Sequence, residues 1–123
     1  MTLKRLLFGR DGESAAVAFL KKKGYRILEQ NFRSKVGEID IIAEQGGTLV
    51  FIEVKARAHH EFGHPFNALT LAKRKKIIQT AQSFLAKKKI SDKPMRFDVV
   101  GLTSAPESPD SWQIEHLENA FQV

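Results

Sequence analysis

Two apolar runs joined by a pair of glycines constrain the fold of this chain more than any other feature. The runs lie at residues 37–43 and 48–56, and Gly46 and Gly47 stand between them. Both runs are rich in β-branched residues, which pack well on a pleated surface. Two such runs around a glycine turn predict a β-hairpin.

Charged residues are set into this hairpin at Asp40, Glu53 and Lys55. A charge inside a strand that is otherwise suited to a core costs several kcal/mol unless something compensates it. Three such residues in one hairpin therefore favour a functional site.

The spacing of these residues predicts which of them meet. Alternate residues of a strand share a face, so Glu53 and Lys55 point the same way, about 7 Å apart. A loop with an even number of residues places Asp40 beside Phe51 or Glu53, on the face of Lys55, whereas an odd loop turns it away. We expect the even loop, since only that loop brings two carboxylates close enough to share a cation.

Two carboxylates beside an ammonium group indicate a Mg²⁺ or Mn²⁺ site that handles phosphate. Mg²⁺ binds through one or two carboxylates and keeps several waters, which leaves positions for substrate oxygens. Lys55 would hold or activate a water molecule, or offset the charge that develops on phosphorus. A buried ion pair of Lys55 with Asp40 or Glu53, without a metal, explains the same spacing.

Length and composition place the chain among ordinary globular proteins. With 123 residues, 42% of them hydrophobic and 28% charged, it is long enough for one domain with a modest core. It has no cysteine, which excludes disulfides and thiolate chemistry. No apolar stretch matches a membrane span or the core of a signal peptide, so we expect a cytoplasmic protein without a membrane partner.

Basic residues exceed acidic ones and give a net charge of +6, concentrated in three clusters. The clusters at residues 21–23 and 87–89 fall at the predicted ends of helices, where cations interact favourably with the helix dipole. The third cluster lies near the predicted start of a helix, where the dipole disfavours cations, so it predicts contacts with nucleic-acid phosphates. Its residues are Lys73, Arg74, Lys75 and Lys76.

The remaining pattern predicts an α/β fold in one domain, residues 1–123, with a mixed central sheet flanked by helices. Asp11 is the expected N-cap of the first helix, and Gly24 is expected to end it. The order of elements is αβββαβ with one added strand at an edge. The predicted helices cover residues 12–23 and 70–88, and the predicted strands cover 25–32, 37–43, 48–56, 95–102 and 112–117.

Several short motifs follow this order of elements: Glu13, Asn31–Arg33, Gly37–Asp40, Phe51–Arg57, Phe62–Pro65, Lys73 and Arg96–Val100. With these motifs the chain resembles the PD-(D/E)xK superfamily of restriction-endonuclease-like nucleases. More narrowly, it is similar to the YraN-like (UPF0102) family of small bacterial proteins of uncharacterised function, which is itself similar to archaeal Holliday-junction resolvases. The resemblance covers residues 9–102, and it implies the restriction-endonuclease-like fold.

The resemblance also implies roles for individual residues. Asp40 and Glu53 occupy the positions of the metal-binding carboxylates, and the carbonyl of Val54 that of a main-chain ligand. Lys55 occupies the position of the catalytic lysine. Glu13 matches an acid of the first helix that reaches the metal directly or through water. The leading proline of the motif is replaced by Ile39, and relatives that act as dimers make a homodimer an expectation.

Other polar and aromatic residues have simpler explanations. We expect Glu38 to pair with Arg33 or Arg57, two arginines that also add to the candidate nucleic-acid contacts. Asp98 is expected to make a structural hydrogen bond or ion pair. The histidines at positions 59, 60 and 64 lack the spacing of a transition-metal site, and the aromatic residues at 112 and 121 are expected to pack in the protein.

Two functional hypotheses follow. The first is a Mg²⁺- or Mn²⁺-dependent endonuclease that cuts DNA without reading sequence, with DNA repair or recombination as its expected context. The second is a nucleic-acid-binding module that keeps the fold and the charge but cleaves little by itself. A weaker alternative is an adaptor whose basic face meets an acidic protein. Fold alone does not decide among them.

Overall fold

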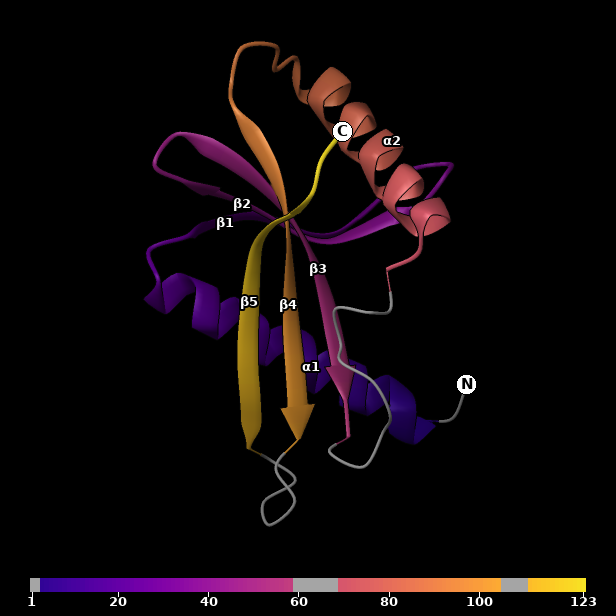
Figure 1. Ribbon diagram of the computed structural model, residues 1–123, viewed down its shortest axis with the longest axis vertical. Helices are drawn as coiled ribbons and strands as arrows, with labels where there is room; N and C mark the ends of the chain where they lie inside the picture. Colours follow the sequence, from indigo (N-terminus) through magenta and orange to yellow (C-terminus); the bar gives the residue numbers. More distant parts are fainter. Residues whose placement is uncertain (1–2, 59–68, 105–110) are drawn as a thin grey trace.

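A five-stranded mixed sheet forms the centre of the structure (Figure 1), which is a computed structural model. It describes residues 3–58, 69–104 and 111–123, and the side chains of the first helix from residue 12 onward. The elements are α1 (Leu3–Lys22), β1 (Arg26–Arg33), β2 (Glu38–Gln45), β3 (Thr48–Arg57), α2 (Leu71–Lys88), β4 (Met95–Ser104) and β5 (Trp112–Phe121).

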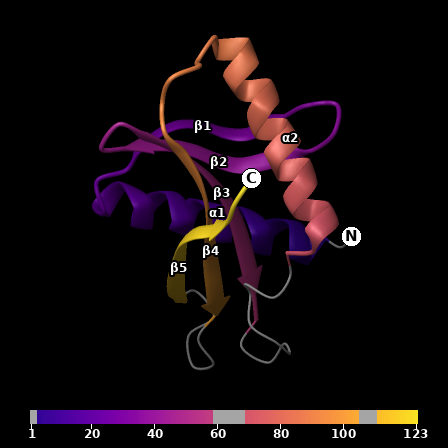
Figure 2. The ribbon, with the colours of Figure 1, turned by 45° about the horizontal axis from the view of Figure 1, so that its top comes forward.

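The strands lie in the order β1-β2-β3-β4-β5. Only β3 and β4 are parallel, and α2 lies between them in the chain, as a parallel pair requires a crossover connection. The sheet is so strongly twisted that β1 and β2 run across β4 and β5 in Figures 1 and 2. The predicted mixed α/β fold is confirmed, with β5 at an edge and longer than expected.

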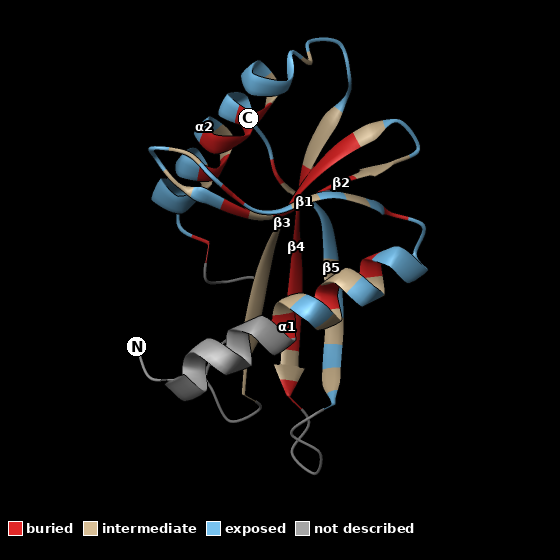
Figure 3. Ribbon diagram, turned by 180° about the vertical axis from the view of Figure 1, so that it is seen from behind, coloured by how far each residue is buried: buried red, intermediate tan, exposed pale blue. Residues whose placement is uncertain are grey.

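The two helices cover opposite faces of the sheet, and each closes its own part of the core. On the α1 face, Ala16 and Leu20 pack with β-strand residues such as Ile41 and Ile52. On the other face, Ile77 and Phe84 of α2 pack in a second cluster. Figure 3 shows the buried positions concentrated in the central strands and on the inner sides of the helices. In the described part, neither helix is long and apolar enough to cross a membrane.

The start of α1 differs from the prediction. The helix begins at Leu3 and runs through Asp11 and Gly12, so Asp11 is not its N-cap. Gly12 looks like a helix breaker in the sequence, but here it allows close packing, because a Cβ at this position would lie 2.8 Å from the Cβ of Ala56 on β3. Tertiary packing therefore outweighs helix propensity at this residue. The predicted end is confirmed, with Gly24 at φ 90° after the last turn.

Candidate metal centre

The turn between β2 and β3 sets the register that the site depends on. Gly46 and Gly47 have φ values of 56° and 83°, and they form a two-residue turn closed by the pair Gln45–Thr48. Backbones with positive φ at both central positions match the twist of a hairpin. The predicted even loop is thus confirmed.

Pairing between β2 and β3 stops where the charged residues begin. The last paired residues are Ile41 and Ile52. Beyond them β3 continues beside β4 alone, while β2 continues beside β1, so the two strands diverge (Figures 1 and 2). Extending the register by one residue places Asp40 opposite Glu53, at the opening of this fork.

Asp40 is held at the fork by the backbone of β3. The backbone N–H of Val54 donates a hydrogen bond to Asp40 Oδ2 over 2.8 Å. In a strand, the N–H and C=O of one residue point toward the same neighbouring strand. The carbonyl of Val54 therefore also faces the β2 side, where Asp40 lies, as expected for a main-chain ligand.

The electrostatics at the fork show a shortage of positive charge. Burial, together with a hydrogen bond to Glu53 and repulsion from its charge, raises the pKa of Asp40 to about 8. The Val54 N–H and the charge of Lys55 oppose this rise without cancelling it. Asp40 thus lies within interaction range of both Glu53 and Lys55.

Glu13 of α1 adds a further acidic group near the fork. Burial raises its pKa, and the negative charges of Asp40 and Glu38 act in the same direction. In the part of the chain that the structure describes, no three His, Cys, Asp or Glu side chains gather closely enough to form a metal-binding group. Direct coordination by Glu13 stays a prediction, and contact through water fits this arrangement better.

Asn31 is a site residue that the sequence analysis did not identify. Its amide nitrogen, in the orientation that satisfies its surroundings, donates to Glu38 Oε1 at 3.0 Å and to Glu13 Oε1 at 3.3 Å. The sequence carries two signals for it: Asn31 opens one of the motifs of the family resemblance, and asparagine is depleted in strands.

The donor set fits a hard divalent cation. Asp40 and Glu53 offer carboxylate oxygens, and Val54 can add its carbonyl, which are the ligand types that Mg²⁺ and Mn²⁺ bind. A carboxyl group with its pKa raised by a second carboxylate is stabilised in its charged form when a cation binds between them. Asp40, Glu53 and Val54 are therefore the residues that can hold such an ion, with Lys55 beside them.

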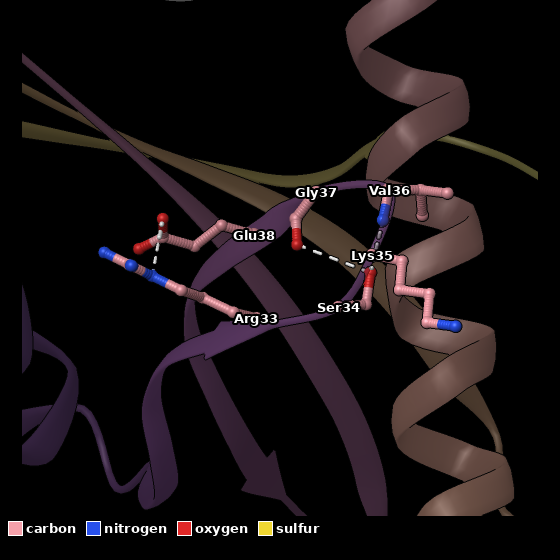
Figure 4. Close-up of a pocket in the computed structure, with 6 residues that line it drawn as sticks. All are labelled: Arg33, Ser34, Lys35, Val36, Gly37 and Glu38. Atoms are coloured by element: carbon pink, nitrogen blue, oxygen red, sulfur yellow. Dashed lines mark hydrogen bonds and ion pairs between the residues drawn. The ribbon is translucent and has the colours of Figure 1, made fainter.

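A loop between β1 and β2 extends from the site toward α2 (Figure 4). Ser34 holds it in shape, because its backbone N–H donates to the Gly37 carbonyl at 2.8 Å and its hydroxyl contacts Thr80 Oγ1 at 3.2 Å. Residues 33–38 line an open hollow of about 500 Å³. The predicted pairing of Glu38 is confirmed, with Arg33 Nε at 3.4 Å from Glu38 Oε2.

The basic residues predicted to contact nucleic acid divide into two groups. Lys73, Lys75 and Lys76 are exposed along the first turns of α2. Lys76 lies next to the loop, since a Cβ on Gly37 would be 3.5 Å from the Cβ of Lys76.

The arginines have partners or neighbours of their own. Arg74 is half-buried, with its guanidinium carbon 5.8 Å from the centre of the Phe121 ring. Arg57 lies half-buried at the end of β3, opposite Thr103 of β4. Arg33 is largely exposed and paired with Glu38. The nucleic-acid role of all six basic residues stays a prediction.

Asp98 has the structural role that the sequence analysis predicted. It is buried and accepts hydrogen bonds from Arg96 Nε at 3.0 Å, His116 Nε2 at 2.7 Å and the Asn119 N–H at 2.9 Å. Although burial raises it, these donors hold the pKa of Asp98 below its usual value. His116 belongs to this network and was not predicted.

The aromatic residues near the C-terminus pack as predicted. Phe121 stacks on Phe97 with ring centres 4.9 Å apart, and Trp112 packs against the α1-side core. The three histidines at positions 59, 60 and 64 lie outside the described residues.

Comparisons with known proteins match this chain over most of its length. A family model described as "Uncharacterised protein family UPF0102" matches residues 12–102. A UPF0102 protein of Geobacter metallireducens is 44% identical over 123 residues, which cover 100% of this chain and 98% of that protein. One from Caldicellulosiruptor saccharolyticus is 49% identical over 113 residues, covering 92% and 95% of the two chains. The chain belongs to the uncharacterised protein family UPF0102.

Proposed function

We propose that this protein is a Mg²⁺- or Mn²⁺-dependent nuclease that hydrolyses DNA phosphodiesters without reading base sequence. The observation that carries the proposal is the fork between β2 and β3, where Asp40 and Glu53 come together beside Lys55. The resemblance to PD-(D/E)xK nucleases supports the same assignment.

Each residue at the fork has its own role in this proposal. Asp40 and Glu53 would hold the cation with the Val54 carbonyl, and the Val54 N–H fixes the Asp40 carboxylate in place. When bound, a divalent ion polarises a phosphoryl oxygen. The Lys55 ammonium group orients the attacking water and offsets the negative charge that develops on phosphorus.

The basic residues would position the substrate. Lys73, Lys75 and Lys76 are exposed, and Lys76 adjoins the loop that leads along β2 to Asp40. Lysines bind phosphates as point charges and carry no base information by themselves. This arrangement favours non-specific or structure-selective action, with repair or recombination of DNA as its proposed context.

The test is cleavage of labelled single-stranded, duplex and branched DNA in Mg²⁺ or Mn²⁺. Asp40→Asn and Lys55→Ala should each abolish cleavage while leaving DNA binding in EDTA within about twofold of wild type. Lys88→Ala, which removes an exposed lysine at the far end of α2, is the matched control and should cleave normally. A wild-type protein that binds all three DNAs and cuts none would favour a binding module.

A further inference from the structure

Asn31 has a backbone conformation that the strand around it does not require. Its φ is 54°, in the left-handed region that residues other than glycine seldom adopt. The register across Asn31 is regular, with the pairs Gln30–Ile41 and Phe32–Ile39 on its two sides. The register shift of β1 lies earlier, between Ile27 and Glu29. By contrast, Asn119, at φ 53°, lies within a register irregularity of β5 and donates its N–H to Asp98.

This conformation coincides with a change of face in the neighbouring strand. Ile39 packs in the α2-side core and Ile41 in the α1-side core, although residues two apart in a regular strand share a face. The change therefore falls at Asp40, the residue that lies opposite Asn31 in the register. At the level of Asn31 and Asp40, the β1–β2 hairpin therefore changes which of its side chains face each side of the sheet.

The amide group of Asn31 bridges two acids that come from different elements. It donates to Glu13 of α1 and to Glu38 of β2, and Glu38 is also held by Arg33 on its other oxygen. These donors offset the mutual repulsion of Glu13 and Glu38, which raises the pKa of Glu13. A left-handed residue that also makes these two bonds is the kind of local strain that functional sites retain.

We infer that Asn31 is a positioning residue of the metal centre: its amide holds Glu13 and Glu38, so that the negative charge next to Asp40 is fixed in place before a cation binds. This inference rests on the metal site of the proposed function. It assigns no contact between Asn31 and the ion or the substrate. Residues that hydrogen-bond to metal ligands typically change metal affinity 10- to 100-fold when they are replaced.

The experiment measures Mn²⁺ binding by calorimetry, without DNA, in a double-mutant cycle of Asn31→Gly and Glu13→Gln. Asn31→Gly removes the side-chain amide, and glycine readily adopts the left-handed backbone conformation, so folding should be preserved. We expect Asn31→Gly to weaken Mn²⁺ binding about tenfold. In the Glu13→Gln background the same change should have a clearly smaller effect, because the two residues act together.

Asn119→Gly is the matched control, since it makes the same change at a left-handed asparagine of β5, and it should bind Mn²⁺ like wild type. The inference is overturned if Asn31→Gly binds Mn²⁺ as tightly as wild type, or if its effect is equal with and without Glu13. If wild type shows the expected coupling but cuts no DNA, the inference is supported and only the proposed nuclease activity fails. If wild type binds no Mn²⁺, both fail.

Discussion

The backbone N–H of Val54 donates to Asp40 Oδ2 over 2.8 Å, across the opening where β2 and β3 separate. This bond joins two strands that have no ladder hydrogen bonds at this level. Burial, together with the hydrogen bond and the charge of Glu53, raises the pKa of this carboxyl group to about 8.

The raised pKa predicts that the metal-free protein loses stability as the pH rises. An unfolded aspartate has a pKa of about 3.9, so between that pH and about 8 the folded state binds the extra proton. Stability then falls with rising pH through this window, and it is lowest above pH 8. Asp40→Asn keeps an oxygen for the Val54 N–H and cannot ionise, so it should melt at a higher temperature than wild type at pH 9 in EDTA.

Thermal unfolding at several pH values, followed by circular dichroism, measures this difference. Mn²⁺ should raise the melting temperature of wild type at pH 9 and leave that of Asp40→Asn nearly unchanged. Melting curves of the two proteins that shift in parallel with pH would contradict the assigned role of Asp40.

The sequence was sufficient to predict the β2–β3 hairpin, but it was not sufficient to predict what α1 and β1 contribute to the site. The glycine turn and the alternation of apolar residues fix which residues of β2 and β3 meet, so Asp40 and Glu53 could be paired in advance. The contributions of Gly12 and Asn31 depend on contacts between elements distant in sequence. No local sequence pattern indicates that Gly12 packs closely against Ala56, or that Asn31 adopts a left-handed backbone within a strand.

The close approach of Gly12 to Ala56 predicts a specific cost for adding a methyl group. In Gly12→Ala the new Cβ would meet the Cβ of Ala56 at 2.8 Å, so α1 must move away from β3. Overpacking of this kind costs about 1–3 kcal/mol of unfolding free energy. Urea denaturation measures the loss, and Ala56→Gly in the same protein should recover most of it, since among the described residues it is Ala56 that the added Cβ would meet.

This pair also tests how the position of α1 affects the site. Glu13 follows Gly12 directly, so the displacement of α1 in Gly12→Ala should weaken Mn²⁺ binding. In the double variant with Ala56→Gly the helix can return, and Mn²⁺ binding should recover. A double variant no more stable than Gly12→Ala alone would show that the clash is not the cause.

The buried Asp98 predicts a destabilisation that depends on pH in the opposite direction from Asp40. Asp98→Asn removes a charge that Arg96 and His116 require, and breaking such a buried network costs about 3–5 kcal/mol. The lowered pKa means that Asp98 stabilises the fold above its unfolded pKa, and that this stabilisation is lost as the pH falls through its folded pKa.

The cost of Asp98→Asn should therefore be large at pH 7 and smaller at pH 3. Urea unfolding of both proteins at the two pH values measures it. The matched control is Asp92→Asn, an exposed aspartate in the connection before β4, which should change the unfolding free energy by less than about 0.5 kcal/mol. An equal cost of Asp98→Asn at both pH values would contradict this account.

The position of Lys76 predicts that the two ends of α2 differ in their contribution to DNA binding. Lys76 adjoins the β1–β2 loop, whereas Lys88 is twelve residues further along the same helix, about 18 Å away at the rise of an α-helix. Both are exposed lysines, so Lys76→Ala and Lys88→Ala remove the same charge from one helix. If DNA follows the loop toward Asp40, Lys76 lies on its path and Lys88 does not.

Fluorescence anisotropy in EDTA, at several salt concentrations, gives the affinity and its salt dependence for both variants. Lys76→Ala should reduce the slope of log affinity against log salt by about 0.9, the value of one phosphate contact, and Lys88→Ala should leave it unchanged. Equal reductions in both variants would indicate attraction by net charge alone and no defined path along the loop.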